Sequence, residues 1–265
     1  MNSYKKLLSI IERKNSILCV GLDSDIKRLP EPFPEAVSSL FEFNREIIDA
    51  TRQYAAAYKI NFAFYEQYGT DGLKILEETV KYIGNDEFVI ADSKRGDIGN
   101  TSTAYAYSAY NYFKSDSMTA APYMGMDSVK PFLNFTDKLT FILALTSNPG
   151  SNDFQRLIVA GKPLYRIVIE KALNWGTKES LGFVVGATHP VELSEIREYL
   201  PDNFLLIPGV GTQGGNVEEI IKANGNSPCI INVSRDIIYA DKGNNFVESA
   251  SKKSSDYRDL FNSFR

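Results

Sequence analysis

The stretch FVIADSKRGD, residues 88–97, begins as a continuous apolar run and ends in a cluster of opposite charges. An apolar run without alternation is typical of a strand that is covered on both faces. Asp92, Lys94 and Asp97 follow the run directly. In a barrel of parallel strands the chemistry lies at the carboxyl ends of the strands. The stretch therefore predicts a buried strand with a functional site at its end.

Seven further apolar runs of the same kind recur along the chain, and helical patterns separate most of them. With residues 88–91, the predicted strands cover residues 17–22, 55–60, 117–122, 139–145, 182–187, 204–208 and 229–233. Apolar residues at helical spacing, or composition that fits a helix, predict helices within residues 37–54, 73–83, 99–116, 164–172, 193–200, 217–221 and 245–263. Pro163 is expected in the first turn of its helix, with Gly176 just past the end.

Eight strands that alternate with helices predict a single (β/α)8 TIM barrel domain over residues 1–265, with an additional helix at each terminus. The amphipathic pattern around Leu7 and Ile11 predicts the N-terminal helix. An open, doubly wound sheet is the alternative architecture. No Pro/Gly/Ser-rich linker divides the chain into two domains.

The composition is that of an ordinary soluble globular protein, with 43% hydrophobic and 23% charged residues among 265. The net charge is −4 and there is no basic stripe, so we expect no nucleic-acid partner. An anion would have to bind at a local site rather than in a general positive field. No run is apolar enough for a signal peptide or a membrane span, and we expect a cytoplasmic protein without membrane contact.

Cysteine and histidine are too scarce to build a metal site or a nucleophilic triad. Cys19 and Cys229 each lie inside an apolar run and are expected to be buried, reduced thiols. The single histidine, His189, precedes Pro190 and is expected in a loop or at a helix start. One histidine and two isolated cysteines make a His/Cys zinc site or a Ser-His-Asp mechanism improbable.

Charged and amide side chains stand at the ends of the second and third predicted strands. The two-residue period of a strand places Lys59 with Asn61 on one face, and Asp92 with Lys94 on one face. Adjacent strands lie about 4.8 Å apart, so Lys59, Asp92 and Lys94 are predicted to touch. Buried charges are costly unless they are paired, and an alternating Lys–Asp–Lys array makes such a group tolerable. Asp97 lies on the following loop and is expected to point away, toward a neighbouring subunit.

Simpler roles remain open for several of these residues. Asp92, Lys94 and Asp97 could form surface ion pairs on a solvated loop, worth under about 1 kcal/mol, although Lys59 on the neighbouring strand argues against this. Asp23 and Asp25 follow the first strand, and either could serve a turn or cap a helix. Asp23 is closer to the strand end and is the better site candidate.

The glycine-rich stretch PGVGTQGG, residues 208–215, runs into a predicted helix. Glycines let backbone N–H groups approach an anion, and a helix N-terminus adds a favourable dipole. Arg235 follows the next strand and supplies a fixed charge with bidentate geometry. Because barrels often bind phosphate with the loops after strands seven and eight, the pair predicts a phosphate site. The stretch is not a Walker P-loop, since no Gly-Lys-Ser/Thr follows it.

Six blocks of the sequence, in this order, resemble the orotidine 5′-monophosphate decarboxylase family, in particular its longer bacterial and protozoan-type branch. The blocks are VGLDSD (20–25), YKINFAFYEQYG (58–69), DSKRGDIGNT (92–101), LTSNPGS (145–151), IPGVGTQGG (207–215) and INVSRDIIYA (231–240). The resemblance covers roughly residues 17–240. It implies a TIM-barrel homodimer that converts orotidine 5′-monophosphate to uridine 5′-monophosphate and CO2, the last step of de novo UMP biosynthesis, without a metal or another cofactor.

The resemblance also implies a role for each matching residue. Lys59, Asp92, Lys94 and Asp97 would form the charged array, with Lys94 as the proton donor and Asp97 supplied by the partner subunit. Asp92 would lie against the departing carboxylate. The implied substrate-binding residues are Asp23 and Asn61 at the ribose, Thr101 across the dimer with Ile98 beside it, Ser147 and Thr146 at the pyrimidine edge, and Gln213, Ser234 and Arg235 at the phosphate.

Two other functions fit the same pattern. Sugar-phosphate decarboxylases and aldolase-like relatives that use Mg²⁺ share the Asp-x-Lys-x-x-Asp frame, but Lys59 would repel a metal ion there. A catalytically silent protein that binds a phosphate ligand could use the same barrel, because a fold does not establish an activity.

Overall fold

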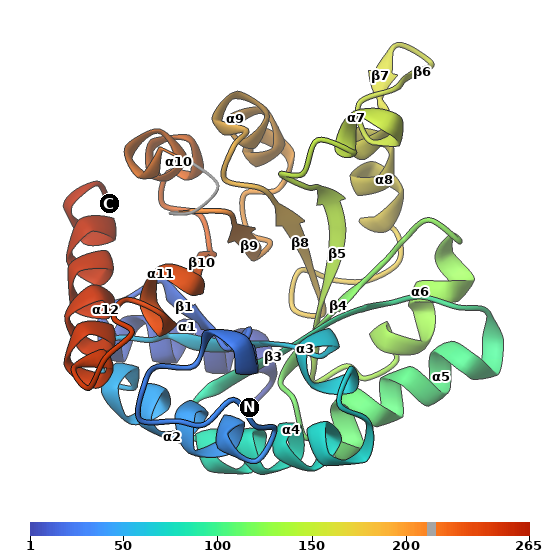
Figure 1. The fold of residues 1–265 in the computed structure, drawn as a ribbon. Helices are drawn as coiled ribbons and strands as arrows, with labels where there is room; N and C mark the ends of the chain where they lie inside the picture. Colours follow the sequence, from blue (N-terminus) through green and yellow to red (C-terminus); the bar gives the residue numbers. More distant parts are fainter. Residues whose placement is uncertain (211–215) are drawn as a thin grey trace.

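Eight parallel strands form a closed barrel in the computed structural model, which describes residues 1–210 and 216–265 (Figure 1). The barrel strands are β1 (Leu18–Gly21), β2 (Ala57–Asn61), β3 (Phe88–Arg95), β4 (Ser117–Ala120), β5 (Leu139–Leu145), β8 (Leu181–Val185), β9 (Leu205–Pro208) and β10 (Cys229–Val233). Pairing of β1 with both β2 and β10 closes the barrel. The predicted (β/α)8 barrel is confirmed, and the open sheet is excluded.

Helices surround the barrel, as expected when the continuous apolar strands must be covered on their outer side (Figure 1). The longer helices are α1 (Ser3–Lys14), α2 (Ser39–Thr51), α4 (Gly69–Ile83), α5 (Gly99–Tyr107), α6 (Met126–Leu133), α8 (Leu164–Ala172), α9 (Pro190–Tyr199), α10 (Val217–Asn224) and α12 (Phe246–Ser263). The short helical turns are η1 (Ile26–Arg28), α3 (Ala63–Glu66), η2 (Ser108–Tyr112), α7 (Ser151–Phe154) and α11 (Arg235–Ile238). In the described part of the chain no helix is long and apolar enough to span a membrane.

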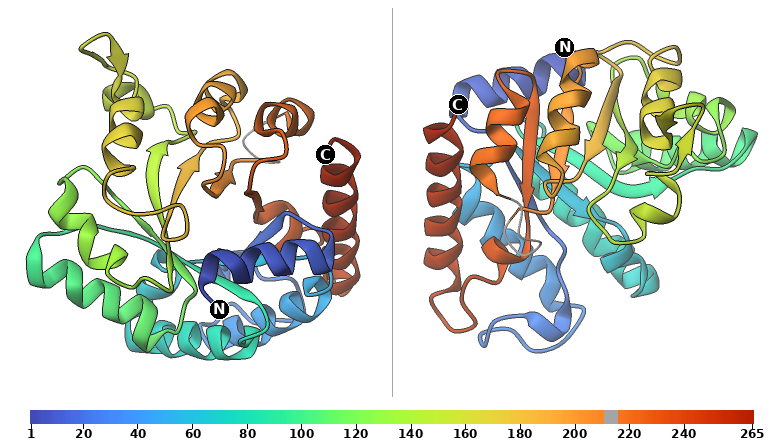
Figure 2. Two further views of the ribbon diagram at one scale, coloured as in Figure 1. Left: turned by 180° about the vertical axis from the view of Figure 1, so that it is seen from behind. Right: turned by 90° about the horizontal axis from the view of Figure 1, so that it is seen from above.

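The N-terminal helix α1 covers the end of the barrel at which the strands begin (Figure 2). The Tyr4 ring packs edge-on against Phe204, just before β9, with ring centroids 5.1 Å apart. Lys6 Nζ lies 2.8 Å from the Asp116 carboxylate, just before β4. Because α1 closes this end, the carboxyl ends of the strands remain as the open face of the barrel.

The C-terminal helix α12 packs against α2 beside the barrel (Figure 2). Phe246 of α12 meets Phe43 of α2 and Phe33, with ring centroids 6.0 and 5.5 Å apart respectively. Aromatic pairs of this kind add about 0.5–1.5 kcal/mol beyond their buried area. Both terminal helices thus pack against the barrel, α1 on β3 and α12 on α2 and β1.

Three helical segments bear on the sequence prediction, and one of them was not predicted. Helix α6 was not predicted; it contains Pro131, which lacks an N–H and normally argues against a helix interior. The helix expected within 99–116 is confirmed as α5, and the π-helical turn η2 follows it directly. Helix α8 begins at Leu164, with Pro163 as its N-cap, and ends at Ala172, before Gly176.

A small hairpin projects from the loop between β5 and α8 (Figure 1). It consists of β6 (Ile158–Val159) and β7 (Lys162–Pro163), which pair antiparallel. This hairpin was not predicted, because each strand has only two residues. Its base, around α7, lies at the open end of the barrel beside the cavity described next.

Candidate active site

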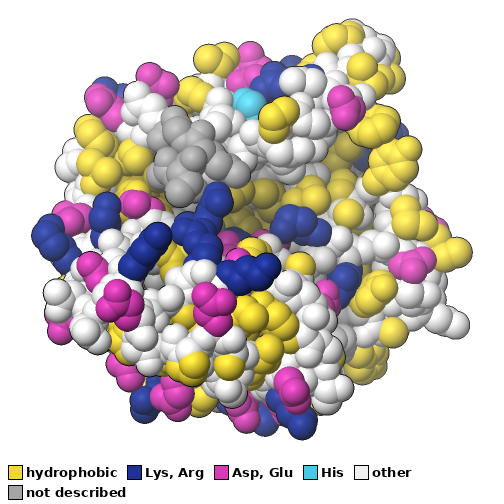
Figure 3. Space-filling view, viewed as in Figure 1, with side chains coloured by type: hydrophobic (Ala, Val, Ile, Leu, Met, Phe, Trp, Pro, Cys, Tyr) yellow, Lys and Arg dark blue, Asp and Glu magenta, His cyan; other side chains and the backbone are white. Residues whose placement is uncertain are grey.

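A cavity of about 460 Å³ opens at the carboxyl ends of the barrel strands (Figure 3). This volume lies within the range of about 300–1,000 Å³ that is usual for small-molecule sites. Lys and Arg side chains stand along its edge in Figure 3, acidic groups lie inside it, and apolar side chains form part of its wall. The lining residues are Asp23, Lys59, Asp92, Lys94, Thr119, Leu143, Thr146, Ser147, Asn148, Gln155, Val184, Leu206, Pro208, Gly209, Val210, Asn232, Ser234, Arg235 and Asp236.

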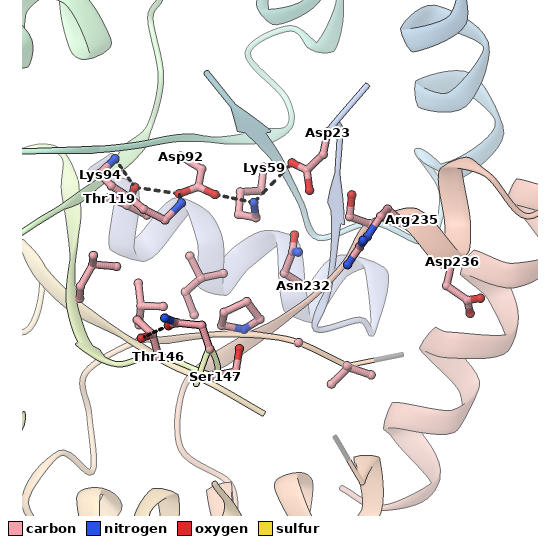
Figure 4. Close-up of a pocket in the computed structure, with 18 of the residues that line it drawn as sticks. Asp23, Lys59, Asp92, Lys94, Thr119, Thr146, Ser147, Asn232, Arg235 and Asp236 are labelled. Atoms are coloured by element: carbon pink, nitrogen blue, oxygen red, sulfur yellow. Dashed lines mark hydrogen bonds and ion pairs between the residues drawn. The ribbon is translucent and has the colours of Figure 1, made fainter. Parts of the chain in front are cut away.

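The predicted alternating array is present on β2 and β3 (Figure 4). Lys59 Nζ lies 2.7 Å from Asp92 Oδ2, and Lys94 Nζ lies 2.6 Å from Asp92 Oδ1. The Thr119 hydroxyl of β4 also donates to Asp92 Oδ1, at 3.0 Å. Only 7% of the Asp92 side chain is exposed, so the surface ion-pair alternative does not hold for Asp92, although its partner Lys94 is 48% exposed.

Burial and pairing act in opposite directions on the two buried charges. Burial alone would raise the pKa of Asp92, but Lys59 and Lys94 outweigh it and hold that pKa far below its usual value. Burial alone would lower the pKa of Lys59, but Asp23 and Asp92 outweigh it and raise that pKa. Both groups are therefore charged at neutral pH, and each depends on the other.

Lys94 stands at a local irregularity of β3. Its φ angle is 47°, in the left-handed region, and the pairing of β3 with β4 shifts between Ala91 and Arg95. The Lys94 N–H donates to Thr119 Oγ1 at 2.9 Å, which anchors this backbone. A non-glycine residue in such a conformation costs of order 1–3 kcal/mol, and such strain clusters at functional sites.

Asp23 and Ser234 extend the polar wall beyond Lys59. Asp23 Oδ1 lies 3.7 Å from Lys59 Nζ, so the ammonium is shared between two carboxylates. The Ser234 hydroxyl donates to the Gly21 carbonyl at 3.0 Å. A Cβ at Gly21 would lie 2.7 Å from Ser234 Cβ, so only glycine allows β1 and the end of β10 to approach this closely.

Arg235 lines the end of the cavity opposite Lys94 (Figure 4). It begins α11, directly after Ser234 at the end of β10. Pro208, Gly209 and Val210 from the end of β9 line the same region. Gln213, predicted as the other phosphate ligand, lies outside the described residues.

Four predicted site residues do not line this cavity in the single chain. The Asn61 carboxamide accepts from the Ala63 N–H at 3.2 Å, at the start of α3. Asp97 Oδ1 accepts from the Ile98 N–H at 2.7 Å, and Ile98 is 58% exposed. Thr101 is exposed on α5. Asp25, for which a cap was an open alternative, is the N-cap of η1 and lies outside the cavity lining.

The cavity contains polar residues that the sequence analysis did not assign to the site. They are Thr119, Asn148, Gln155, Asn232 and Asp236. Thr119 and Asn232 are polar residues inside apolar runs, which is a usable signal for an inward-facing polar position. Gln155 follows the short helix α7 and offered no such signal, because only the path of the chain brings it back to the cavity.

A comparison with protein families matches residues 16–250 to the "Orotidine 5'-phosphate decarboxylase / HUMPS family". The chain belongs to this family. It is 51% identical over 254 residues to the orotidine 5′-phosphate decarboxylase of Christiangramia forsetii, covering 94% of this chain and 93% of that protein. The resemblance stated from the six sequence blocks is thereby confirmed.

Solved structures of the family agree with the barrel. Leishmania donovani OMP decarboxylase has a TM-score of 0.87 and 35% identity, covering 100% of this chain and 98% of that chain. Leishmania donovani UMP synthase has a TM-score of 0.90 and 36% identity, but this chain spans only 56% of it.

Cys19 and Cys229 are free, buried thiols on the neighbouring strands β1 and β10. Burial raises the pKa of Cys229 to about 11, so this thiol stays protonated and unreactive at neutral pH. The register places Cys19 opposite Asn232, three residues beyond Cys229. The expectation of buried thiols is confirmed.

Proposed function

We propose that this chain converts orotidine 5′-monophosphate to uridine 5′-monophosphate and CO2, the last step of de novo UMP biosynthesis. The observation that carries the proposal is the Lys59–Asp92–Lys94 array, which shares one cavity with Arg235. The family and its named relatives support the same reaction. The scheme needs no metal ion and no other cofactor.

In this reaction the bond between the pyrimidine ring and the carboxylate breaks, and CO2 leaves. The electron pair stays on the ring carbon, and Lys94 Nζ–H delivers the proton that forms the new C–H bond. A fixed ammonium suits this step, because preorganised charge need not reorganise as negative charge develops. Asp92 Oδ1, 2.6 Å from Lys94 Nζ, holds the lysine side chain in position.

The rest of the nucleotide would lie across the cavity from Lys94 toward Arg235. Lys59 and Asp23 stand between them and would bind the ribose hydroxyls, with Asn61 after a small rearrangement. Thr146 and Ser147 face Asp92 and Lys94 across the cavity, and Ser147 would meet the pyrimidine edge with Thr146 close by (Figure 4). Arg235, Ser234 and Gln213 would hold the phosphate, whose binding energy orients the base.

We further propose that the site is completed by the partner subunit of a homodimer, through Asp97 and Thr101 with Ile98 beside them. In the single chain Ile98 is 58% exposed, and none of the three lines its own cavity. An exposed isoleucine next to a carboxylate and a threonine that lie outside the chain's own cavity is what a surface that meets a second site would present.

The direct test is to incubate the purified protein with orotidine 5′-monophosphate and to follow the pyrimidine absorbance. Loss of the substrate band with release of CO2, unchanged by EDTA, supports the proposal. Binding without turnover would instead favour a silent phosphate-ligand protein. Turnover that EDTA abolishes would favour a Mg²⁺-dependent relative.

Arg235→Ala is expected to raise KM about 10- to 100-fold and to change kcat much less, because it removes charge-assisted hydrogen bonds to a part of the substrate that does not react. Steady-state kinetics with orotidine 5′-monophosphate measure both values. Arg166→Ala, which removes an arginine paired with Glu170 on α8, is the matched control. A fall in kcat without a rise in KM would contradict the phosphate role.

Mixing Lys94→Ala chains with Asp97→Ala chains is expected to restore about a quarter of the wild-type activity. Random exchange makes half of the dimers mixed, and each mixed dimer has one site with both residues intact. Activity is measured before and after subunit exchange, with exchange verified by mass-tagged chains. No gain after verified exchange would rule out a shared site.

A further inference from the structure

Thr146, at the end of β5, has its N–H, its hydroxyl and its carbonyl all held by other parts of the protein. The Gln155 carboxamide contacts it through both of its polar atoms: Oε1 accepts from the Thr146 N–H at 2.7 Å and lies 3.2 Å from Thr146 Oγ1, and Nε2 lies 2.9 Å from the same Oγ1. The Thr146 hydroxyl in turn donates to Asn148 Oδ1 at 2.6 Å. Gln155 thus holds the backbone and the side chain of one cavity residue at once.

The carbonyl of Thr146 is held from the opposite side by His189. His189 Nε2 lies 3.2 Å from the Thr146 carbonyl oxygen, and Nδ1 lies 2.8 Å from Arg156 Nη2. A guanidinium can only donate, so Nδ1 must be the acceptor and Nε2 must carry the proton. The Nε2–H therefore points toward the Thr146 carbonyl and the Thr188 hydroxyl, each 3.2 Å from Nε2.

Gln155 and His189 are themselves fixed by the surrounding elements. The Gln155 N–H donates to the Ser151 carbonyl of α7, and its carbonyl accepts from the Tyr165 N–H of α8, both at 2.9 Å. Arg156, which contacts His189, also forms an ion pair with Glu192 of α9. The hydrogen bonds to Thr146 therefore connect the end of β5 to three helices.

The next residue, Ser147, is confined by this arrangement and by Gly186. A Cβ at Gly186 would lie 2.8 Å from Ser147 N and Cβ, so β8 and the end of β5 are in close contact there. Thr146 and Ser147 form the cavity wall across from Lys94 (Figure 4). These contacts hold this part of the cavity wall in place.

We propose that Gln155 and His189 are positioning residues for recognition of the pyrimidine ring, acting through Thr146 to aim Ser147. This inference rests on the proposed function, which places the base between Lys94 and Ser147. Thr146 does not itself bind the base in this proposal, because its N–H, hydroxyl and carbonyl already form hydrogen bonds within the protein. Preorganised groups of this kind favour binding because little freedom is lost when the ligand arrives.

The experiment compares ligands with and without the base. For wild type, Gln155→Ala, His189→Ala and His189→Gln, the affinities for uridine 5′-monophosphate and for ribose 5-phosphate are measured by calorimetry, alongside kcat and KM. Asn152→Ala, on the exposed side of α7, is the matched control. Thermal melting checks that every variant is folded.

Gln155→Ala is expected to weaken uridine 5′-monophosphate binding and to raise KM about tenfold, with ribose 5-phosphate affinity within about twofold of wild type. His189→Ala should show a smaller loss of the same kind. His189→Gln should recover most of it, because the glutamine amide can replace the Nε2–H donor. Asn152→Ala should resemble wild type.

Unchanged uridine 5′-monophosphate affinity in both alanine variants, or equal weakening of ribose 5-phosphate, would overturn the inference. If Gln155→Ala does not fold, the comparison of His189→Ala with His189→Gln still tests the inference. A wild-type protein that binds uridine 5′-monophosphate but does not decarboxylate the substrate would sink the proposed function alone, because the affinity comparison does not require turnover.

Discussion

Lys94→Ala is expected to lower kcat by at least about 10⁴-fold while the protein remains folded. In the proposed reaction Lys94 both stabilises the developing carbanion, worth about 10²–10³-fold for a preorganised group, and donates the proton, worth about 10²–10⁴-fold. No other described residue can replace it, because Lys59 is buried between Asp23 and Asp92. Single-turnover kinetics at saturating substrate measure the chemical step.

The control for this prediction is Lys252→Ala, which removes a lysine paired with Asp256 on α12. Substrate binding by Lys94→Ala should be measured separately, so that lost chemistry is distinguished from lost affinity. A fall in kcat of less than about tenfold would remove Lys94 from both the electrostatic and the acid role.

Asp92→Ala is expected to destabilise the fold by about 3 kcal/mol, in addition to abolishing turnover. Removing one partner of a buried ion pair leaves an uncompensated charge, which typically costs about 3–5 kcal/mol. The lower end applies because Asp23 remains 3.7 Å from Lys59 Nζ. Urea unfolding of the two proteins at neutral pH measures the difference.

Combining Asp92→Ala with Lys59→Met tests whether the uncompensated Lys59 charge causes the loss of stability. The double variant should be less destabilised than the sum of the two single variants, because the isolated ammonium is no longer present. Additive effects, or a single Asp92→Ala effect within about 0.5 kcal/mol of zero, would show that the array does not bear on stability.

The free energy of unfolding should also depend differently on acidic pH in the Asp92→Ala variant. The pKa of Asp92 is depressed in the folded state, so its contribution is fully present above the unfolded value of about 3.9 and is lost as the pH falls below it. Asp92→Ala should therefore flatten the fall of stability below about pH 4. An unchanged acid limb would contradict the depressed pKa.

The sequence predicted the barrel because eight mainly apolar runs recur along the chain and helical patterns separate most of them. It placed Lys59, Asp92 and Lys94 together for an equally local reason. The two-residue period of a strand and the spacing between adjacent strands bring these three side chains close to one another. It did not predict α6, because Pro131 locally disfavours the helix that packing on β5 stabilises.

The positions of Gln155 and His189 could not be predicted in the same way. Gln155 reaches Thr146 only because the chain turns back after α7, and His189 reaches it from the segment between β8 and α9. Neither residue carries a periodic pattern or a motif, since a hydrogen bond between loops leaves no repeat in the sequence.

By itself, the sequence determined the architecture and the chemical identity of the site, because strand periodicity and burial are short-range consequences of residue type. Only the tertiary structure decided which loop residues fix the cavity wall, which predicted residues stay outside the single-chain cavity, and how Asp23 shares Lys59 with Asp92. Those arrangements depend on where distant segments meet when the barrel closes, and the free energy that selects them comes from packing rather than from local preference.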